Sequence, residues 1–162
     1  IYGLGNYSSP VITPKVSTLE GKFDVGGGAA LSIPFGMMSS LDFGAQYVRR
    51  KYSFGVGDER NLTAVEFPVL FRLWLASVIS FGVGGYYGMN TGNVPANYSK
   101  SDYGLVGSFA IDIPMGMVMG LVLDARYVRG LSDLNKTTGG VYKTQEMQAI
   151  VGFRFGMPLM GK

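Results

Sequence analysis

The chain has 162 residues, enough for one domain with its own core and short for two. Its 14 Lys and Arg residues, against 11 Asp and Glu, are scattered along the sequence, so nothing favours nucleic-acid binding. Charged residues make up only 15% of the chain and apolar types 47%, which indicates that something other than water covers part of the surface.

Cysteine and histidine are both absent. Their absence excludes disulfides, zinc sites of the usual kind, and nucleophilic catalysis by Ser-His or Cys-His pairs. We therefore expect no enzyme activity, no metal and no cofactor. The chain opens at Ile1 with neither an initiator methionine nor a signal peptide, which indicates either a mature exported protein or a trimmed chain, and the sequence leaves both open.

Side chains alternate between an apolar and a polar face along most of the chain, the period-two pattern of β-strands. Phe67, Val69 and Phe71, for example, share one face. Glu66 and Arg72 share the other. Extending this parity predicts eight antiparallel strands, most of about the length that crosses a bilayer at a tilt. The predicted strands are residues 1–9, 22–33, 40–52, 62–73, 77–89, 102–113, 119–131 and 143–156.

The predicted connections alternate in length and polarity. Long outer loops that alternate with tight periplasmic turns are typical of an up-and-down outer-membrane β-barrel. The long, polar connections are residues 10–21, 53–61, 90–101 and 132–142, and the short, apolar ones are residues 34–39, 74–76 and 114–118.

An internal repeat relates the two halves of the chain. Residues 33–50 align without gaps on residues 113–130 at an offset of 80, and nine of the 18 positions are identical. The same offset maps Glu66 onto Glu146. We interpret residues 1–162 as a single barrel domain built from two halves of four strands each.

Periodicity alone does not distinguish a transmembrane barrel from a soluble lipocalin-like barrel with its apolar face turned inward. The apolar tight turns favour the membrane, as do small residues interleaved with charges on the polar face. Arg72 and Arg126 would each cost roughly 2 to 4 kcal/mol on the lipid face near the midplane. The tyrosines expected to form an aromatic girdle toward the long loops are Tyr47, Tyr52, Tyr86, Tyr87, Tyr98, Tyr103, Tyr127 and Tyr142.

The charged face is expected to line the lumen as a salt-bridge network that closes it to ions, because buried charges need partners. An active site of paired carboxylates is the alternative, but it needs a substrate cavity that a filled lumen lacks. The predicted lumen network is Asp24, Asp42, Arg50, Glu66, Arg72, Asp112, Asp124, Arg126, Glu146 and Arg154.

Hairpin geometry predicts which of these charges meet. Loops centred near residues 56 and 137 place Asp42 across from Arg72 and Arg126 across from Glu146. The other predicted neighbours are Asp24 with Arg50, and Gln46 with Glu66.

Cations and tyrosines also gather where predicted strands meet the long loops. At an outer rim they would either bind lipopolysaccharide phosphates or extend to the interface without a specific ligand, and the sequence leaves both open. The predicted lipid-rim residues are Arg49, Lys51, Tyr47, Tyr52, Tyr127 and Arg129.

Near the carboxyl end, the sequence AIVGFRF from Ala149 to Phe155 resembles the insertion signal read by the barrel-assembly machinery. With this segment and the predicted architecture, the chain resembles the OmpA-type family of small outer-membrane barrels. The resemblance implies a monomer in the bacterial outer membrane, in contact with membrane lipids, with a structural or anchoring role. A binding or transport module is the alternative: a carrier of small hydrophobic ligands or a narrow gated pore.

Overall fold

The computed structural model describes residues 2–8, 11–13, 22–53, 59–76, 78–91, 99–116, 118–132 and 141–155. Within these ranges every regular element is a β-strand. None of the described residues belongs to a helix long and apolar enough to cross a membrane. The strands are β1 (Tyr2–Ser8), β2 (Val11–Thr13), β3 (Lys22–Pro34), β4 (Ser39–Ser53), β5 (Glu59–Ala76), β6 (Ile79–Thr91), β7 (Ser101–Pro114), β8 (Met119–Gly130), β9 (Val141–Lys143) and β10 (Gln145–Phe155).

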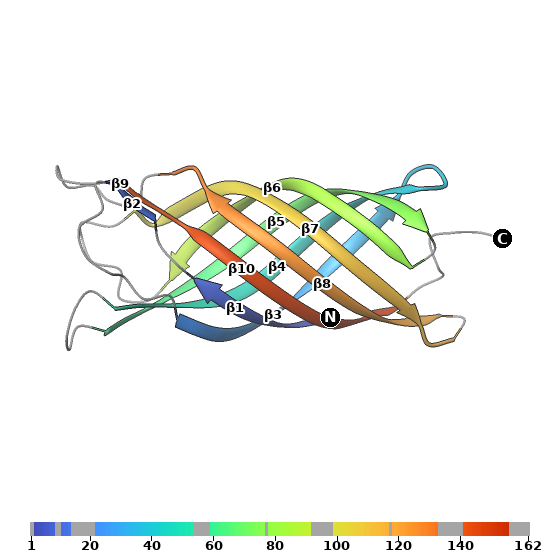
Figure 1. The fold of residues 1–162 in the computed structure, drawn as a ribbon, viewed down its shortest axis with the longest axis horizontal. Coiled ribbons are helices and arrows are strands. Elements are labelled where there is room, and N and C mark those ends of the chain that lie inside the picture. The colour runs from blue at the N-terminus through green and yellow to red at the C-terminus, as the bar shows by residue number, and fades with distance from the viewer. Residues whose placement is uncertain are drawn as a thin grey trace.

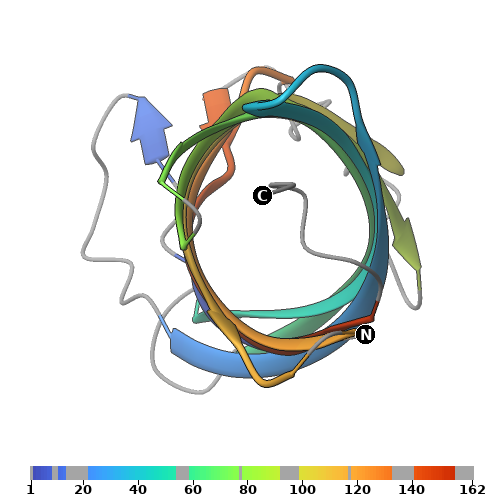
Figure 2. The same ribbon diagram turned by 90° about the vertical axis from the view of Figure 1, so that its right-hand side faces the viewer.

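The long strands join edge to edge in a barrel (Figures 1 and 2). The order around the closed ring is β1-β10-β8-β7-β6-β5-β4-β3, and neighbouring strands run antiparallel. The short strands β2 and β9 pair with each other at the end of the barrel that carries the longer connections (Figure 1). The predicted all-β, antiparallel barrel architecture is therefore confirmed.

Some connections differ from the prediction. Residues 74–76, predicted as a tight turn, belong to β5, and the register with β6 shifts between Trp74 and Ala76. This segment contains neither glycine nor proline, so nothing in it ends a strand. Residues 10–21, predicted as a loop, contain β2, and residues 132–142, also predicted as a loop, contain the first two residues of β9. Their sequences Val-Ile-Thr and Val-Tyr-Lys are rich in β-branched residues, which favours pairing.

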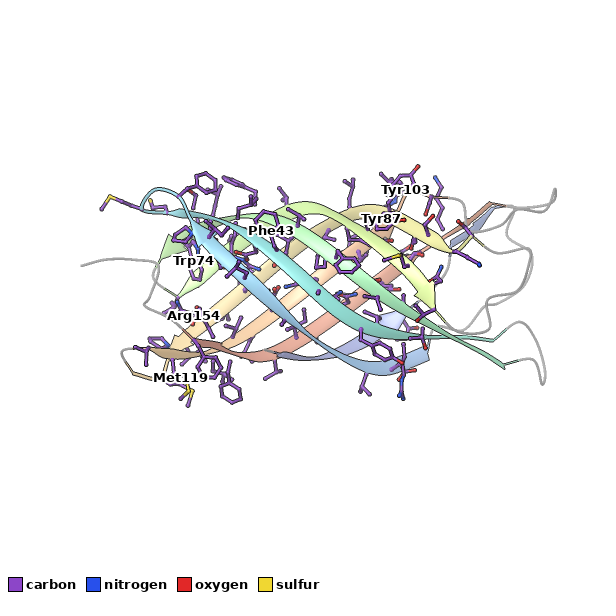
Figure 3. All side chains as sticks on the ribbon, turned by 180° about the vertical axis from the view of Figure 1, so that it is seen from behind. Phe43, Trp74, Tyr87, Tyr103, Met119 and Arg154 are labelled. Carbon is purple, nitrogen blue, oxygen red and sulfur yellow. The ribbon has the colours of Figure 1, made fainter. Side chains whose placement is uncertain are left out.

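The two faces of the barrel wall differ in chemistry. Large apolar side chains point away from the ring and are exposed. Leu75, for example, is 66% exposed and Val83 is 64% exposed. Alternate positions are buried inside, with Glu66 1% and Arg72 5% exposed. Figure 3 shows side chains on both sides of the wall, with Phe43 between the two ends of the barrel. A soluble carrier needs the opposite arrangement, because its apolar face must leave water.

The tight turns repeat between the two halves of the chain. Gly36 and Gly116 lie 80 residues apart and have positive φ angles of 78° and 132°. A side chain disfavours this backbone region, and glycine avoids the penalty. In both turns the residue before the glycine donates its backbone N–H to the carbonyl four residues ahead, at 3.0 and 2.9 Å. The repeated Ile-Pro-x-Gly sequence therefore makes the same connection twice.

The offset of 80 relates strands that lie opposite each other in the ring. It maps β1, β3, β4 and β5 onto β6, β7, β8 and β10, and each pair is half a ring apart. The pairing of neighbours is repeated as well, because Tyr2 opposes Gly28 just as Gly82 opposes Ser108. The barrel thus has an approximate twofold axis along its lumen.

Candidate functional site

Arg72 on β5 connects three other strands through the interior. Its Nε lies 2.7 Å from Asp42 Oδ2 on β4, and its Nη1 donates to Ser80 Oγ on β6 at 3.0 Å. Its Nη2 lies 3.1 Å from Asp124 Oδ2 on β8, although β6 and β7 separate β5 from β8 in the ring. The guanidinium therefore crosses the lumen and neutralises carboxylates on both sides of it.

Asp124 also forms an ion pair with a second arginine, which lies on the same strand. Arg126 Nε lies 2.9 Å from Asp124 Oδ2, and Ser108 donates its hydroxyl to Oδ1 at 2.7 Å. Only 2% of the Asp124 side chain is exposed. Two cations and one hydroxyl compensate for the loss of water around this carboxylate.

Gln46 lies where opposite walls of the barrel touch. Its Nε2 donates to Glu66 Oε2 at 2.7 Å and to Gln148 Oε1 at 3.2 Å, and its Oε1 accepts from Arg126 Nη1 at 3.4 Å. Since β4 and β8 are diametrically opposite, the contact between Gln46 and Arg126 spans the full width of the lumen. Gln148 also donates to Glu66 at 3.5 Å and to Glu146 at 3.2 Å. Polar side chains therefore meet across the barrel at this level.

A further buried carboxylate, Asp102, was not selected from the sequence. It accepts hydrogen bonds from Tyr86 and Thr144, both at 2.8 Å, and from Ser132. Tyr86 therefore points inward, and its assignment to the outer girdle was wrong. The signal was available, because Asp102 and Asp112 share one parity on β7 and Tyr86 shares the parity of the small inward residues of β6.

Arg154 lies near the turn end of the barrel (Figure 3) and forms an ion pair with Asp112. Arg154 Nη2 donates to Asp112 Oδ1 at 3.2 Å, and Nε approaches Oδ2 to 2.7 Å at an angle that makes an ion pair without a hydrogen bond. Gly120 leaves room for the pair, since a Cβ there would lie 2.6 Å from Asp112 Oδ1. Beside β3 the filling is looser, because Ala30 and Ser32 remain exposed.

The register explains which predicted contacts form. It centres the two hairpins near residues 56 and 137, but Asp42 faces Leu70 and Arg126 faces Gln148. The long Arg72 side chain still reaches Asp42 along the diagonal. Arg126 contacts Asp124 and Gln46. The prediction that Arg126 directly opposes Glu146 was wrong, because Gln148 opposes Arg126 and Glu146 opposes Val128. The repeat implied equal registers, whereas β8–β10 is shifted by two residues relative to β4–β5.

The other predicted lumen residues are placed as follows. Asp24 is buried and accepts the backbone N–H of Val25 at 2.8 Å. The side chain of Arg50 lies outside the described residues, and so does its predicted contact with Asp24. In the parts of the chain that the structure describes, no group of three or more acidic, His or Cys side chains is arranged to hold a metal ion.

The rim residues whose side chains the structure describes lie on the outer face, toward the loop end. Tyr47, Tyr127, Arg49 and Arg129 are all exposed, and the guanidinium carbon of Arg49 lies 6.0 Å from the centre of the Tyr47 ring. Tyr87 and Tyr103 are exposed near the same end (Figure 3). The side chains of Lys51, Tyr52, Tyr98 and Tyr142 lie outside the described residues.

An apolar outer wall around a charged interior defines the fold as an outer-membrane type of β-barrel. Among solved structures, the chain is similar to the outer membrane protein OprG from Pseudomonas aeruginosa, with a TM-score of 0.54 and 13% sequence identity. The similarity covers 96% of this chain and 91% of that chain. It supports the barrel fold and does not single out the OmpA type. No protein-family model and no curated protein matches the sequence.

Proposed function

We propose that this protein is a monomeric structural barrel of the bacterial outer membrane, with a lumen closed by its own charged and amide side chains. The observation that carries the proposal is the contact of Gln46 with Arg126 from diametrically opposite strands. Arg72 also bridges β4 and β8, and these contacts across the lumen support the proposal that ions find no continuous water path at this level.

The outer wall supports the membrane location. Phe67, Phe71 and Leu123 are 39%, 37% and 38% exposed, among many other large apolar side chains on the same face. A contiguous surface of this kind is unfavourable in water by about 25 cal/mol per Å² of apolar area, and lipid removes that cost. In contrast, turning the face of Arg72 outward would expose buried ion pairs to hydrocarbon.

The loop end of the outer wall is proposed to contact lipopolysaccharide. Exposed arginines bind phosphate well, and tyrosines prefer the boundary between hydrocarbon and water. The rim comprises Arg49, Lys51, Arg129, Tyr47, Tyr52 and Tyr127. At the other end of β10, Phe153 and Phe155 are exposed and are proposed to be read by the barrel-assembly machinery during insertion.

Conductance across planar bilayers tests the closed lumen. The purified protein, refolded and shown to be compact by faster migration of the unboiled sample on a gel, is expected to give no stable conductance step. Replacing Gln46 and Gln148 together by alanine removes the amides that join opposite walls, and is expected to produce steps. An outward control, Val69→Ala, should remain silent. A stable step from the unmodified barrel would contradict closure.

A further inference from the structure

A groove on the outer wall is lined by residues of β1, β7, β8 and β10. These four strands are consecutive in the ring (Figure 1). Its volume is about 520 Å³, and a second groove of about 290 Å³ continues it toward the turn end. Phe109, Ala125 and Ala149 line both. Since Ala125 and Ala149 are direct cross-strand partners, the depression exists because two small side chains lie together between larger ones.

The walls of the groove are large and apolar. Tyr127 and Met147 oppose each other on the side nearer the loops, and Leu123 and Val151 oppose each other on the side nearer the turns. An apolar groove on the outer wall fits a flexible hydrocarbon chain, because a chain fills the space that the alanines leave.

Two cationic side chains lie at the loop end of this groove. Arg129 is two residues beyond Tyr127 on β8 and directly opposes Gln145, and Lys143 is two residues beyond Gln145. Lys143 ends β9, which pairs with β2, and the backbone N–H of Gly130 donates to the carbonyl of Thr144 at 2.8 Å, which holds this segment beside the end of β8. Cross-strand neighbours one step apart along a pair of strands lie about 7 to 8 Å from each other, within reach of one anionic group for two long cationic side chains. Neither forms a hydrogen bond or ion pair with the residues that the structure describes, although Arg126 and Arg154 inside the lumen do.

We propose that this groove is a binding site for one phosphate-bearing lipid, with an acyl chain along Ala125 and Ala149 and the phosphate between Arg129 and Lys143. The proposal rests on the membrane location proposed above and makes it more specific: one lipid is held at one place, beyond the general lipid contact of the rim. Charge complementarity selects an anionic lipid over a second copy of the chain, which would bring the same cations together.

The repeat supplies a contrasting wall. Across the barrel, the equivalents of Ala149 and Met147 are Val69 and Phe67, which are larger. The equivalent of Arg129 is Arg49, which lies over the Tyr47 ring. Ala45, the equivalent of Ala125, is also exposed and pairs with Ala29. Ala45 therefore offers a matched control position with the same residue type.

The experiment is native mass spectrometry of the chain of residues 1–162, refolded in mild detergent with dimyristoyl phosphatidylglycerol. We expect a discrete species with one lipid bound. Arg129→Gln is expected to weaken this binding about tenfold, and Ala149→Leu to abolish it by filling the groove. The matched controls Lys100→Gln and Ala45→Leu are expected to bind as the unmodified chain does. Inorganic phosphate alone should not compete, because the acyl chain supplies most of the contact.

Three outcomes would overturn the site. Equal weakening by Arg129→Gln and Lys100→Gln would mean a general charge effect. Lipid binding that is unchanged by Ala149→Leu would show that the groove does not hold the lipid. A dimer that the unmodified chain forms and Ala149→Leu does not would show that this surface is an interface between copies of the chain. Heat-modifiable migration of each variant separates this test from the proposed function: a barrel that inserts but holds no discrete lipid contradicts only the site.

Discussion

At the scale of single residues, the alternation of inward and outward positions along each strand decides which charged side chains are buried. Glu66, Arg72 and Arg126 were assigned to the inner face from alternation alone, and they are buried there. The individual partners could not be derived in the same way, because a guanidinium reaches several neighbours and the register decides among them. The contact of Arg72 with Asp124 crosses two intervening strands, which no local pattern in the sequence encodes.

Arg72→Met tests the central cation of the network. The variant leaves Asp42 and Asp124 without their shared guanidinium, and breaking a buried ion pair by removing one partner costs about 3 to 5 kcal/mol. We expect the free energy of unfolding to fall by that amount. Urea unfolding in detergent micelles measures it, with the fluorescence of Trp74, the sole tryptophan, as the signal.

Phe71→Met is the matched control for Arg72→Met, since it changes the neighbouring residue on the outer face. Contact with detergent should keep its effect below about 1.5 kcal/mol, as for other swaps of similar apolar volume. Equal losses in the two variants would mean that the ion pairs add nothing specific.

At the scale of elements, alternation located the long strands well, and turn chemistry explains the errors. The end of β5 was misplaced because Trp74 to Ala76 carries no residue that ends a strand, and a register shift absorbs the irregularity there. The pairing of β2 with β9 joins segments more than 100 residues apart, so no local pattern predicts it.

Gly36→Ala tests whether the repeated turn depends on its backbone conformation. Alanine at a φ of 78° is expected to lower the free energy of unfolding by about 1 to 2 kcal/mol. The same urea titration measures the change. Gly107→Ala serves as the control, because a Cβ there meets nothing within 4 Å. A Gly36→Ala barrel as stable as Gly107→Ala would show that the turn adapts without strain.

At the scale of the whole molecule, the approximate twofold axis places repeat equivalents half a ring apart across a narrow lumen. Glu66 and Glu146 are equivalents that are both buried, whereas other equivalents combine a charged side chain with glycine. The equivalent of Arg72 is Gly152, and the equivalent of Asp124 is Gly44. The repeat itself was evident from the sequence. That its equivalent residues meet on the axis, as Gln46 and Arg126 do, required the ring order of the strands.

The orientation of the two faces is tested most directly by tryptophan quenching in vesicles of brominated phospholipid. In a Trp74→Phe background, Phe71→Trp and Leu123→Trp place the fluorophore on the outer wall, and Tyr86→Trp places it inside. The outer-wall variants are expected to lose most of their emission to the bromines, and the Tyr86→Trp variant to keep most of it. Strong quenching of Tyr86→Trp with bright emission from the outer-wall variants, in barrels shown to be folded by unboiled gel migration, would contradict a lipid-facing apolar wall around a charged lumen.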